Sequence, residues 1–349
     1  MKFMDNLKEI NYGEAIYEGC YQEMERDDSV FVYGLGVDDA KGHYGTSKDL
    51  HKVFGSKRNF DMPLSEDAMT GVGIGAALAG LRPIYVHQRM DFLLLCMNQL
   101  VNMAAKLRYM SCGEHSVPLV VRAAIGRSWG QGAQHSQAFH SYFMHVPGIK
   151  VVAPTNPHDA KGCLIKSIRD NNPVIFVEHR MLYQNKGFVP NGLYEVEFGK
   201  GRILIEGSDI TLVGVSYTVT DCVRAALALK EIGISAEVID PVSLSPIDYK
   251  IIRKSANKTK KVLVVDNGWL TCGFSSEVIA DLGINCSGIE LDRMGYLESP
   301  CPTTKVLENA FYPNPENVAL RANFICKGDP SWKPEKISRD EISSFKGPF

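Results

Sequence analysis

The segment Asp61-Met-Pro-Leu-Ser-Glu66 places a carboxylate at the start of a run of small and apolar residues, Ala68-Met-Thr-Gly-Val-Gly-Ile-Gly-Ala-Ala-Leu-Ala-Gly-Leu81. Repeated glycines lower helix propensity, so we expect a helix that lets another backbone or a ligand approach closely. An apolar surrounding favours the protonated form of a carboxylate, which can hydrogen-bond a heterocyclic nitrogen and share a proton with it. A helix-terminal glutamate that interacts with the helix dipole explains the same spacing. The segment alone leaves both interpretations open.

Runs of β-branched and apolar residues alternate with helical patterns on both sides of this segment. In the first half the expected strands are 29–34, 83–87, 117–122, 149–153 and 173–178, and the longer helical patterns are 91–110 and 156–169. In the second half the expected strands are 209–216, 235–240, 261–266 and 288–291, with a helix at 221–231. This alternation predicts parallel sheets covered by helices on both faces.

The pattern is lost between Tyr183 and Gly201, where glycine, proline and polar residues dominate, so we expect a linker there. We therefore predict an α/β protein with two parallel-sheet, three-layer domains, at residues 1–185 and 203–326, joined by a linker at 186–202. Residues 327–349 are charged and poor in apolar side chains. We expect this tail to dock on a partner or to stay mobile.

The composition excludes several classes of protein. The 349 residues are 45% hydrophobic and 22% charged, with a formal net charge of −2, which gives no reason to expect nucleic acid or an anionic membrane as a partner. No apolar run approaches the roughly 18 residues of a membrane span, and the N-terminus shows neither a secretory nor a transit peptide. Nine cysteines without a CxxC pair are typical of reduced thiols, so we expect a cytoplasmic protein.

Several motifs can be weighed from their spacing. The glycines at 71, 73 and 75 lie within the helical pattern, which excludes a dinucleotide-binding turn, and the sequence has no Walker A lysine motif and no GxSxG elbow. Histidines 135, 140 and 145 recur every five residues, which does not bring them together on one helix face. His135 follows the glycine-rich loop 126–134 and begins what reads as a helix start, so a functional and a structural role are both open. All nine histidines lie at or before His179, which assigns acid–base chemistry near neutral pH to the first half.

The bend Ile168-Arg-Asp-Asn-Asn-Pro173 joins a helical pattern to a strand. It reads either as a helix C-cap with a proline stop or as a group of carbonyl oxygens that could hold a monovalent cation.

Together these motifs resemble the beta subunit of the thiamine-diphosphate-dependent decarboxylating component of 2-oxo acid dehydrogenases of the pyruvate type. The resemblance runs from about Tyr12 to Leu307. It is carried by short matches in one order, at residues 23–27, 63–66, 80–83, 104–106, 109–113, 134–137, 147–152, 159–162 and 168–173. The resemblance implies a thiamine-diphosphate pyrimidine-binding domain followed by a domain like the transketolase C-terminal domain.

The resemblance also implies roles for single residues. Glu66 would hydrogen-bond the aminopyrimidine of thiamine diphosphate, Phe92 would stack on that ring, and Gln88 would line the same pocket. His135 would face the reacting carbon and orient the 2-oxo acid or the lipoyl acceptor. A monovalent cation, by expectation K⁺, would bind the backbone carbonyls of Leu119, Ser167, Ile168, Asp170 and Asn172.

The motif with which thiamine enzymes hold Mg²⁺ and the diphosphate, Gly-Asp-Gly with a later Asn, is missing from this chain. The chain can therefore supply only the pyrimidine half of the site. The resemblance implies that an alpha-type subunit supplies the other half in an α2β2 heterotetramer. It also implies that the second domain builds subunit contacts and docks a lipoyl acyltransferase core.

The chain departs from this family at a few positions. Leu35 stands where the family has an acid that is associated with proton transfer between paired active sites, and Val86 and His87 replace a more typical Glu-Phe pair. Two alternatives therefore remain: a split transketolase or carboligase subunit that passes the carbanion to an aldehyde or sugar, and a non-catalytic scaffold subunit. The retention of Glu66, Phe92 and His135 argues against the scaffold.

Overall fold

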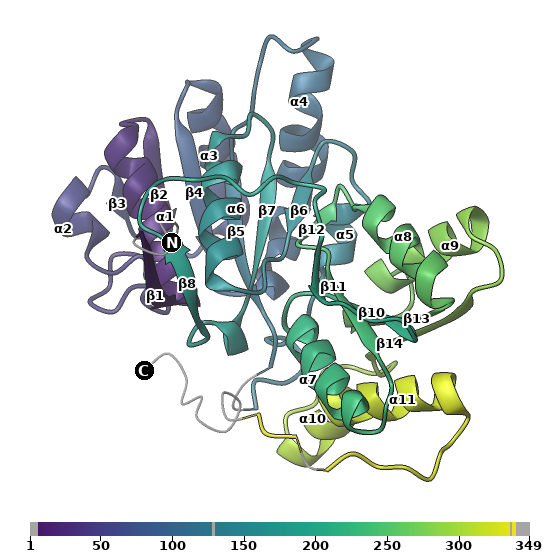
Figure 1. Cartoon of the computed structure of the whole chain (residues 1–349). Coiled ribbons are helices and arrows are strands. Elements are labelled where there is room, and N and C mark those ends of the chain that lie inside the picture. The colour runs from purple at the N-terminus through teal and green to yellow at the C-terminus, as the bar shows by residue number, and fades with distance from the viewer. Residues whose placement is uncertain (1–5, 128–129, 336, 340–349) are drawn as a thin grey trace. The chain divides into compact units, whose positions relative to one another are not determined.

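The computed structural model describes residues 6–127, 130–335 and 337–339. The chain forms two compact units, each with its own sheet (Figure 1). The first unit contains the described residues up to Ile125 and from Tyr142 to Phe198, and the second contains those of segment 126–141 and those from Gly199 onward. Segment 126–141 therefore belongs to the second unit, although it lies inside the first domain that we expect from the sequence.

The first unit is built around parallel strands in the order β6-β7-β5-β4-β2-β3. Its strands are β1 (Leu7–Asn11), β2 (Val30–Gly34), β3 (Asn59–Phe60), β4 (Arg82–His87), β5 (Val120–Ile125), β6 (Lys150–Val152), β7 (Val174–His179) and β8 (Lys186–Pro190). Its helices are α1 (Tyr12–Arg26), α2 (Leu50–Phe54), α3 (Glu66–Leu78), η1 (Met90–Cys96), η2 (Asn98–Ala104), α4 (Ala105–Met110), α6 (Pro157–Arg169) and η3 (Arg180–Leu182). A short helix, α5 (His140–Met144), lies where the chain returns from the second unit.

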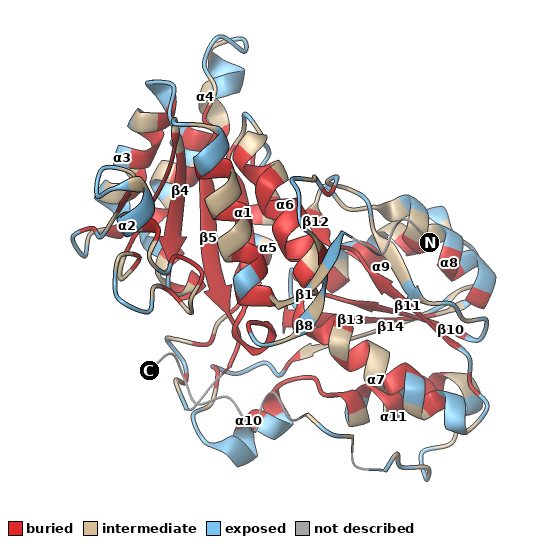
Figure 2. Ribbon diagram, turned by 60° about the vertical axis from the view of Figure 1, so that its left-hand side comes forward, coloured by how far each residue is buried: buried red, intermediate tan, exposed pale blue. Residues whose placement is uncertain are grey.

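Helices cover both faces of this sheet. Tyr85 of β4 points toward α3, where its hydroxyl lies 3.4 Å from the carbonyl oxygen of Glu66. Arg122 of β5 pairs in register with Val86, the next residue of β4, and points toward α1, where it contacts Cys20 at 3.9 Å. Because successive side chains of a strand point to opposite faces, α1 and α3 lie on opposite sides. Helix α6 lies beside α1 (Figure 2).

The second unit has a five-stranded sheet in the order β14-β13-β10-β11-β9, with β9 antiparallel to β11 and the remaining neighbours parallel. Its strands are β9 (Arg202–Ile205), β10 (Ile210–Gly214), β11 (Ala236–Asp240), β12 (Ser243–Ser245), β13 (Lys261–Trp269) and β14 (Glu290–Tyr296). Its helices are α7 (Tyr217–Glu231), α8 (Tyr249–Thr259), α9 (Phe274–Asn285), α10 (Lys305–Phe311) and α11 (Pro315–Lys327).

The two faces of this second sheet differ in chemistry. Leu212 of β10 packs in an apolar cluster with Leu229 of α7 and Val318 of α11. Thr211, the preceding residue of the same strand, points to the other face and lies 2.7 Å from the hydroxyl of Thr259 in α8. Figure 1 shows α7 and α11 together and α8 beside α9, so this unit also has three layers.

The expected fold class, two α/β domains of three layers, is confirmed, with local differences. The predicted linker 186–202 contains a strand, because β8 pairs antiparallel with β1 near the start of the chain. The strand expected at 117–122 begins only at Val120, since Pro118 has no N–H for the ladder. The helix expected over 91–110 is divided into a 3₁₀, a π and an α segment. The domain boundaries that we expect from the sequence stay predictions.

Two further observations concern the described part of the chain alone. Its helices include none with the length and apolar character of a membrane span. Part of the expected tail, residue 336 and residues 340–349, lies outside the described residues.

Candidate active site

Glu66 is the first residue of α3, as its position before the small-residue run predicts, and only 8% of it is exposed. It lines a cavity of about 350 Å³ at the carboxyl ends of β2 and β4. The cavity is lined by mostly apolar and aromatic side chains of the first unit: Leu35, Met62, Leu64, Glu66, Tyr85, Val86, His87, Gln88, Arg89, Phe92 and Leu95. The structure thus brings together three of the four predicted catalytic and cofactor-binding residues, namely Glu66, Gln88 and Phe92.

The glycines of α3 have different surroundings. A Cβ atom at Gly73 would lie 2.1 Å from the hydroxyl oxygen of Tyr33, whereas a Cβ atom at Gly71 or Gly75 would have no neighbour within 4 Å. The Tyr33 hydroxyl donates to the carbonyl of Met69 at 3.0 Å. The close approach that the sequence predicts is therefore made at Gly73, by a side chain of β2.

The backbone carbonyl of Glu66 has two hydroxyl neighbours, one from α3 and one from β4. Thr70 donates to the carbonyl of Glu66 at 2.7 Å, and the Tyr85 hydroxyl lies 3.4 Å from the same oxygen. Tyr85 stacks on Tyr33 with the ring centroids 4.6 Å apart and an interplanar angle of 6°. These contacts fix the backbone from which the Glu66 side chain reaches the cavity.

The Glu66 carboxylate has no partner in the part of the chain that the structure describes. Among the described residues, no side chain or backbone N–H hydrogen-bonds it and no basic group pairs with it. Its oxygens are also not among the fully enclosed polar atoms, so they remain accessible from the cavity. The geometry therefore suits a hydrogen-bonding ligand in this cavity.

Gln88 connects the ends of two neighbouring strands at the cavity. Its amide Nε2 donates to the carbonyl of Leu35 at 3.1 Å. The strand ends approach closely here, because a Cβ atom at Gly34, whose φ is 153°, would lie 2.3 Å from the carbonyl oxygen of Val86. Leu35 itself is half-buried and lines the cavity.

His87 is a buried polar residue in the cavity lining. Its ring lies 4.1 Å from that of Tyr85, centroid to centroid, and its Nε2 lies 3.9 Å from Cys96 Sγ. Burial lowers the pKa of His87 to about 3. His87 is therefore a neutral group at neutral pH and packs against the Tyr85 ring.

His135 belongs to the second unit and does not line this cavity. The helix start that we predicted at residues 134–137 is wrong: residues 133–135 form a turn, and α5 begins only at His140. The segment takes this shape because Gly130 and Gly132 have φ values of 74° and 66°, and residues 301–303 pack against it.

The carbonyl oxygens of the predicted cation site are partly engaged within the chain. The Arg82 guanidinium donates to the carbonyls of Ile168 at 2.8 Å and Asp170 at 3.3 Å. The Leu119 carbonyl accepts from the Val174 N–H at 2.9 Å, and the Ser167 carbonyl accepts from the Asp170 N–H at 3.3 Å. A carbonyl has two lone pairs, so these bonds leave acceptor capacity for a cation. No cluster of three or more His, Cys, Asp or Glu side chains within the described ranges could hold a metal ion.

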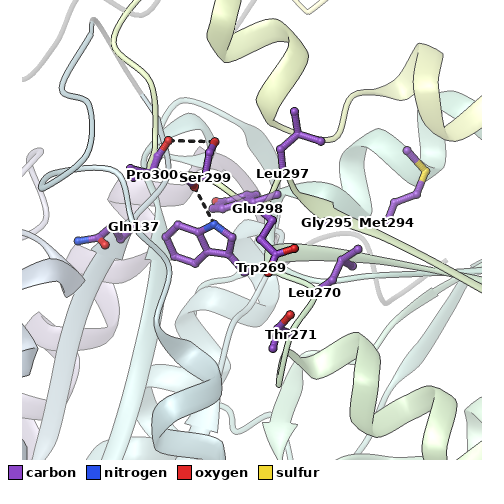
Figure 3. Close-up of a pocket in the computed structure, with 11 residues that line it drawn as sticks. Gln137, Trp269, Leu270, Thr271, Met294, Gly295, Leu297, Glu298, Ser299 and Pro300 are labelled. Atoms are coloured by element: carbon purple, nitrogen blue, oxygen red, sulfur yellow. Dashed lines mark hydrogen bonds between the residues drawn. The ribbon is translucent and has the colours of Figure 1, made fainter.

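A second cavity, of about 650 Å³, lies in the second unit (Figure 3). Trp269 borders it and donates through its indole Nε1 to the carbonyl of Ser299 at 3.0 Å. Gln137, two residues after His135, also lines this cavity. It is lined as well by Leu270, Thr271, Met294, Gly295, Tyr296, Leu297, Glu298 and Pro300.

Sequence reasoning missed several residues of these sites. Tyr85 could have been found, because it lies two residues before His87 on β4. The side chains of Tyr85 and His87 therefore point to the same face of the strand that leads to Gln88. Arg89 could have been found as the basic residue next to Gln88. The residues that hold the His135 segment could not, because they lie more than 120 positions away in the chain.

Comparisons with known proteins agree with this arrangement. Residues 8–186 match the transketolase pyrimidine-binding domain, and residues 199–318 match the transketolase C-terminal domain. The chain is 39% identical to the acetoin:2,6-dichlorophenolindophenol oxidoreductase subunit beta of Cupriavidus necator, over 90% of this chain and 96% of that one. It is 38% identical to the pyruvate dehydrogenase E1 component subunit beta of Gracilaria tenuistipitata, over 89% and 98% of the two chains.

Among solved structures, the fold is similar to that of a split-gene transketolase described as an inactive beta4 tetramer. The TM-score is 0.75 at 20% identity, and the match covers 91% of this chain and 98% of that one. Both domain matches and the near full-length relatives place the chain in one group. The chain belongs to the family of pyruvate dehydrogenase and acetoin oxidoreductase beta subunits, which are built from transketolase-type pyrimidine-binding and C-terminal domains.

Proposed function

We propose that this chain is the beta subunit of a thiamine-diphosphate-dependent 2-oxo acid dehydrogenase and that it is active only with an alpha-type subunit. The observation that carries the proposal is the carboxylate of Glu66, which has no partner among the described residues and lines a cavity together with Gln88 and Phe92. An aminopyrimidine ring suits this cavity, because it needs one acidic partner, an aromatic surface and apolar walls.

In this proposal each residue has one task. Glu66 hydrogen-bonds a ring nitrogen of the aminopyrimidine and holds or releases a proton there. Phe92 offers its ring for stacking, and Gln88, fixed by its bond to the Leu35 carbonyl, limits the cavity at the strand ends. When bound, thiamine diphosphate supplies the carbanion chemistry, and the protein supplies position and proton transfer.

The remaining parts of the proposal concern the assembly. The alpha-type subunit holds Mg²⁺ and the diphosphate, in an α2β2 complex, and a lipoyl group on an acyltransferase core accepts the acyl group. His135 orients the 2-oxo acid or this acceptor. K⁺ binds the carbonyl oxygens of Leu119, Ser167, Ile168, Asp170 and Asn172. A cytoplasmic location stays a prediction from the sequence.

The experiment is reconstitution of the purified chain with an alpha-type subunit. We expect the isolated chain to bind thiamine diphosphate weakly or not at all in titration calorimetry. We expect the complex to bind it in the presence of Mg²⁺ and to reduce an artificial dye when a 2-oxo acid is added. Because relatives are named for pyruvate and for acetoin, both compounds are tested as substrates.

Three results would contradict the proposal. Micromolar, Mg²⁺-dependent binding by the isolated chain would show that it holds the whole cofactor site. Transfer to an aldehyde or sugar acceptor without oxidation would favour the transketolase or carboligase alternative. A complex that binds the cofactor but turns over no substrate of either class would favour the scaffold.

Glu66→Gln is the decisive variant, and Asp67→Asn is its matched control. Both acids lie in the first turn of α3, so both interact with the helix dipole, by roughly 0.3–1 kcal/mol each. Asp67 is exposed and does not line the cavity. If Glu66 serves only the dipole, the two variants behave alike; if it serves the cofactor, only Glu66→Gln loses activity.

A further inference from the structure

The segment that carries His135 is held by the second unit. The chain leaves the first unit after Ile125 and returns to it at Tyr142, and segment 126–141 groups with the second unit between these points. His135 is half-buried in this segment. The contacts made by its described residues therefore decide where the His135 side chain lies.

Arg127 anchors the start of the segment. Only 5% of it is exposed. Its guanidinium Nη1 donates to the carbonyl of Glu308 at 3.2 Å, and the guanidinium carbon lies 5.0 Å from the centre of the Tyr312 ring. A buried guanidinium with a planar ring and a carbonyl as partners has few alternative positions.

Residues 301–303 hold the middle of the segment. A Cβ atom at Gly132 would lie 2.4 Å from Thr303 Cγ2, and a Cβ atom at Gly130 would lie 3.0 Å from the Thr303 carbonyl oxygen. The Cys301 thiol contacts the carbonyl of Ser136, the residue after His135, at 3.5 Å. The backbone around His135 is thus packed against the second unit on both sides of the histidine.

His140 anchors the end of the segment. Its Nε2 lies 3.2 Å from Oδ1 of Asp266, and the exposed fractions of the two side chains are 1% and 0%. The other carboxylate oxygen, Oδ2, accepts from the Ser275 N–H at 2.8 Å, at the start of α9. Next to His140, the ring of Phe139 stacks on that of Trp269 at 5.9 Å. The Asp266 carboxylate therefore joins the segment to β13 and α9.

We propose that His140 and Asp266 are positioning residues for the substrate step, acting through the segment that carries His135. The proposal rests on the role proposed above for His135. It gives the second unit a part in catalysis in addition to contacts between subunits.

The test compares His140→Leu with His140→Gln in the reconstituted complex. An ionised carboxylate only accepts hydrogen bonds, so the glutamine amide can replace the imidazole N–H while leucine cannot. We expect His140→Leu to lower kcat/KM for the 2-oxo acid by roughly 10- to 100-fold, the loss typical of a displaced group in an active site. We expect its affinity for thiamine diphosphate to stay within about twofold of wild type, since Glu66 lies in the other unit. His140→Gln should recover most of the activity.

Two further readouts separate positioning from general stability. The double variant His135→Ala with His140→Leu should lose no more kcat/KM than His135→Ala alone, because both changes remove the contribution of the His135 side chain to the substrate step. Hydrogen–deuterium exchange of amides in 130–139 should become faster in His140→Leu and stay slow in His140→Gln. The exchange experiment needs no substrate, so it reports on the anchor even if the complex turns over no 2-oxo acid, which would count against the proposed function instead.

Several results would overturn the inference. Equal losses of cofactor affinity and turnover in His140→Leu would mean that the pair only stabilises the fold, and so would additive losses in the double variant. If His140→Leu does not fold, Arg127→Met and Arg127→Lys test the other anchor in the same assays. Normal kcat/KM in a folded Arg127→Met or His140→Leu complex would exclude a positioning role.

Discussion

Gly73 and Tyr33 are in contact in a way that no other residue at position 73 would allow. A Cβ atom there would lie 2.1 Å from the Tyr33 hydroxyl oxygen. That hydroxyl donates to the carbonyl of Met69, and the Tyr33 ring stacks on Tyr85, which lines the cavity beside Glu66. A glycine inside a helix thus fixes the distance between α3 and the sheet at the candidate site.

Gly73→Ala should therefore destabilise the chain although alanine is the better helix former. Overpacking of a buried position costs roughly 1–3 kcal/mol, while the gain in helix propensity is at most about 1 kcal/mol. Gly75→Ala is the matched control, because its Cβ has no neighbour within 4 Å, and it should be neutral or stabilising. Chemical denaturation of both variants measures the difference. Tyr33→Phe, combined with Gly73→Ala, should restore part of the lost stability, because it removes the hydroxyl that the alanine Cβ would meet. Equal stabilities of Gly73→Ala and Gly75→Ala would mean that the Tyr33 hydroxyl does not lie close to position 73 in solution.

His87 should make stability depend on pH. Its pKa in the folded chain is lowered to about 3 by burial, whereas an unfolded histidine titrates near 6.5. Between these values the unfolded chain binds one more proton, so the free energy of unfolding falls as pH falls, by up to about 1.4 kcal/mol per pH unit. Above about pH 6.5 His87 is neutral in both the folded and the unfolded chain, so it no longer makes the free energy of unfolding depend on pH.

His87→Phe should remove this slope, because phenylalanine fills the same buried place without titrating. Denaturation of wild type and variant at several pH values between 4 and 7 provides the measurement. The difference between their free energies of unfolding removes the contributions of other buried histidines, such as His43, because these are the same in both proteins. Parallel pH dependences would show that His87 is not desolvated as described.

Potassium should stabilise the chain if the five carbonyl oxygens bind it. Arg82 already donates hydrogen bonds to the Ile168 and Asp170 carbonyls. We therefore expect K⁺ to raise the stability of the chain only moderately, in addition to the stabilisation from Arg82. The thermal midpoint should be higher in KCl than in NaCl or choline chloride at the same ionic strength. Equal midpoints in the three salts would mean that the bend Ile168–Pro173 is only a helix end followed by a strand.

Leu35→Glu should cost less stability than a fully buried charge would. In the sequence, the neighbours Val32, Tyr33 and Val37 predict a dry, apolar site, in which a buried unpaired charge would cost several kcal/mol. Leu35 is half-buried and lines the cavity, so water can reach a carboxylate there and the variant should fold.

Because Leu35 replaces the acid associated with proton transfer between paired active sites, wild-type complexes should activate their two cofactors without strong coupling. Pre-steady-state kinetics measures this activation. Clearly biphasic, half-of-sites activation would mean that another residue relays protons and that Leu35 is irrelevant to it.

The parts of the fold that the sequence predicted are those with strong local signals. The strands around Val32, Ile84 and Ile175 follow from the sequence, because runs of β-branched and aromatic residues are typical of strands buried on both faces. Strand β8 was missed because Lys186–Pro190 is short and contains a glycine and a proline, and its partner β1 lies near the other end of the unit's sequence. Local patterns do not contain such pairings.

The same limit applies to the sites. Glu66 lies in the segment after β3, and Gln88 and Phe92 lie directly after β4. Motifs and the family resemblance were therefore enough to place these three residues in one pocket. The attachment of His135 to the second unit depends on contacts such as His140 with Asp266, which are separated by 126 positions. A periodic pattern cannot reveal an anchor of that kind.

Exchange of the thiazolium C2 proton of bound thiamine diphosphate with deuterium tests the central proposal most directly. The proton that Glu66 shares with the aminopyrimidine would promote the imino form, which in turn would remove the C2 proton. In complexes with an alpha-type subunit, we predict that Glu66→Gln slows this exchange by roughly 10²–10⁴-fold, while Asp67→Asn leaves it unchanged. An unchanged exchange rate in Glu66→Gln, with cofactor bound, would contradict the assignment of this cavity as the pyrimidine half of the active site.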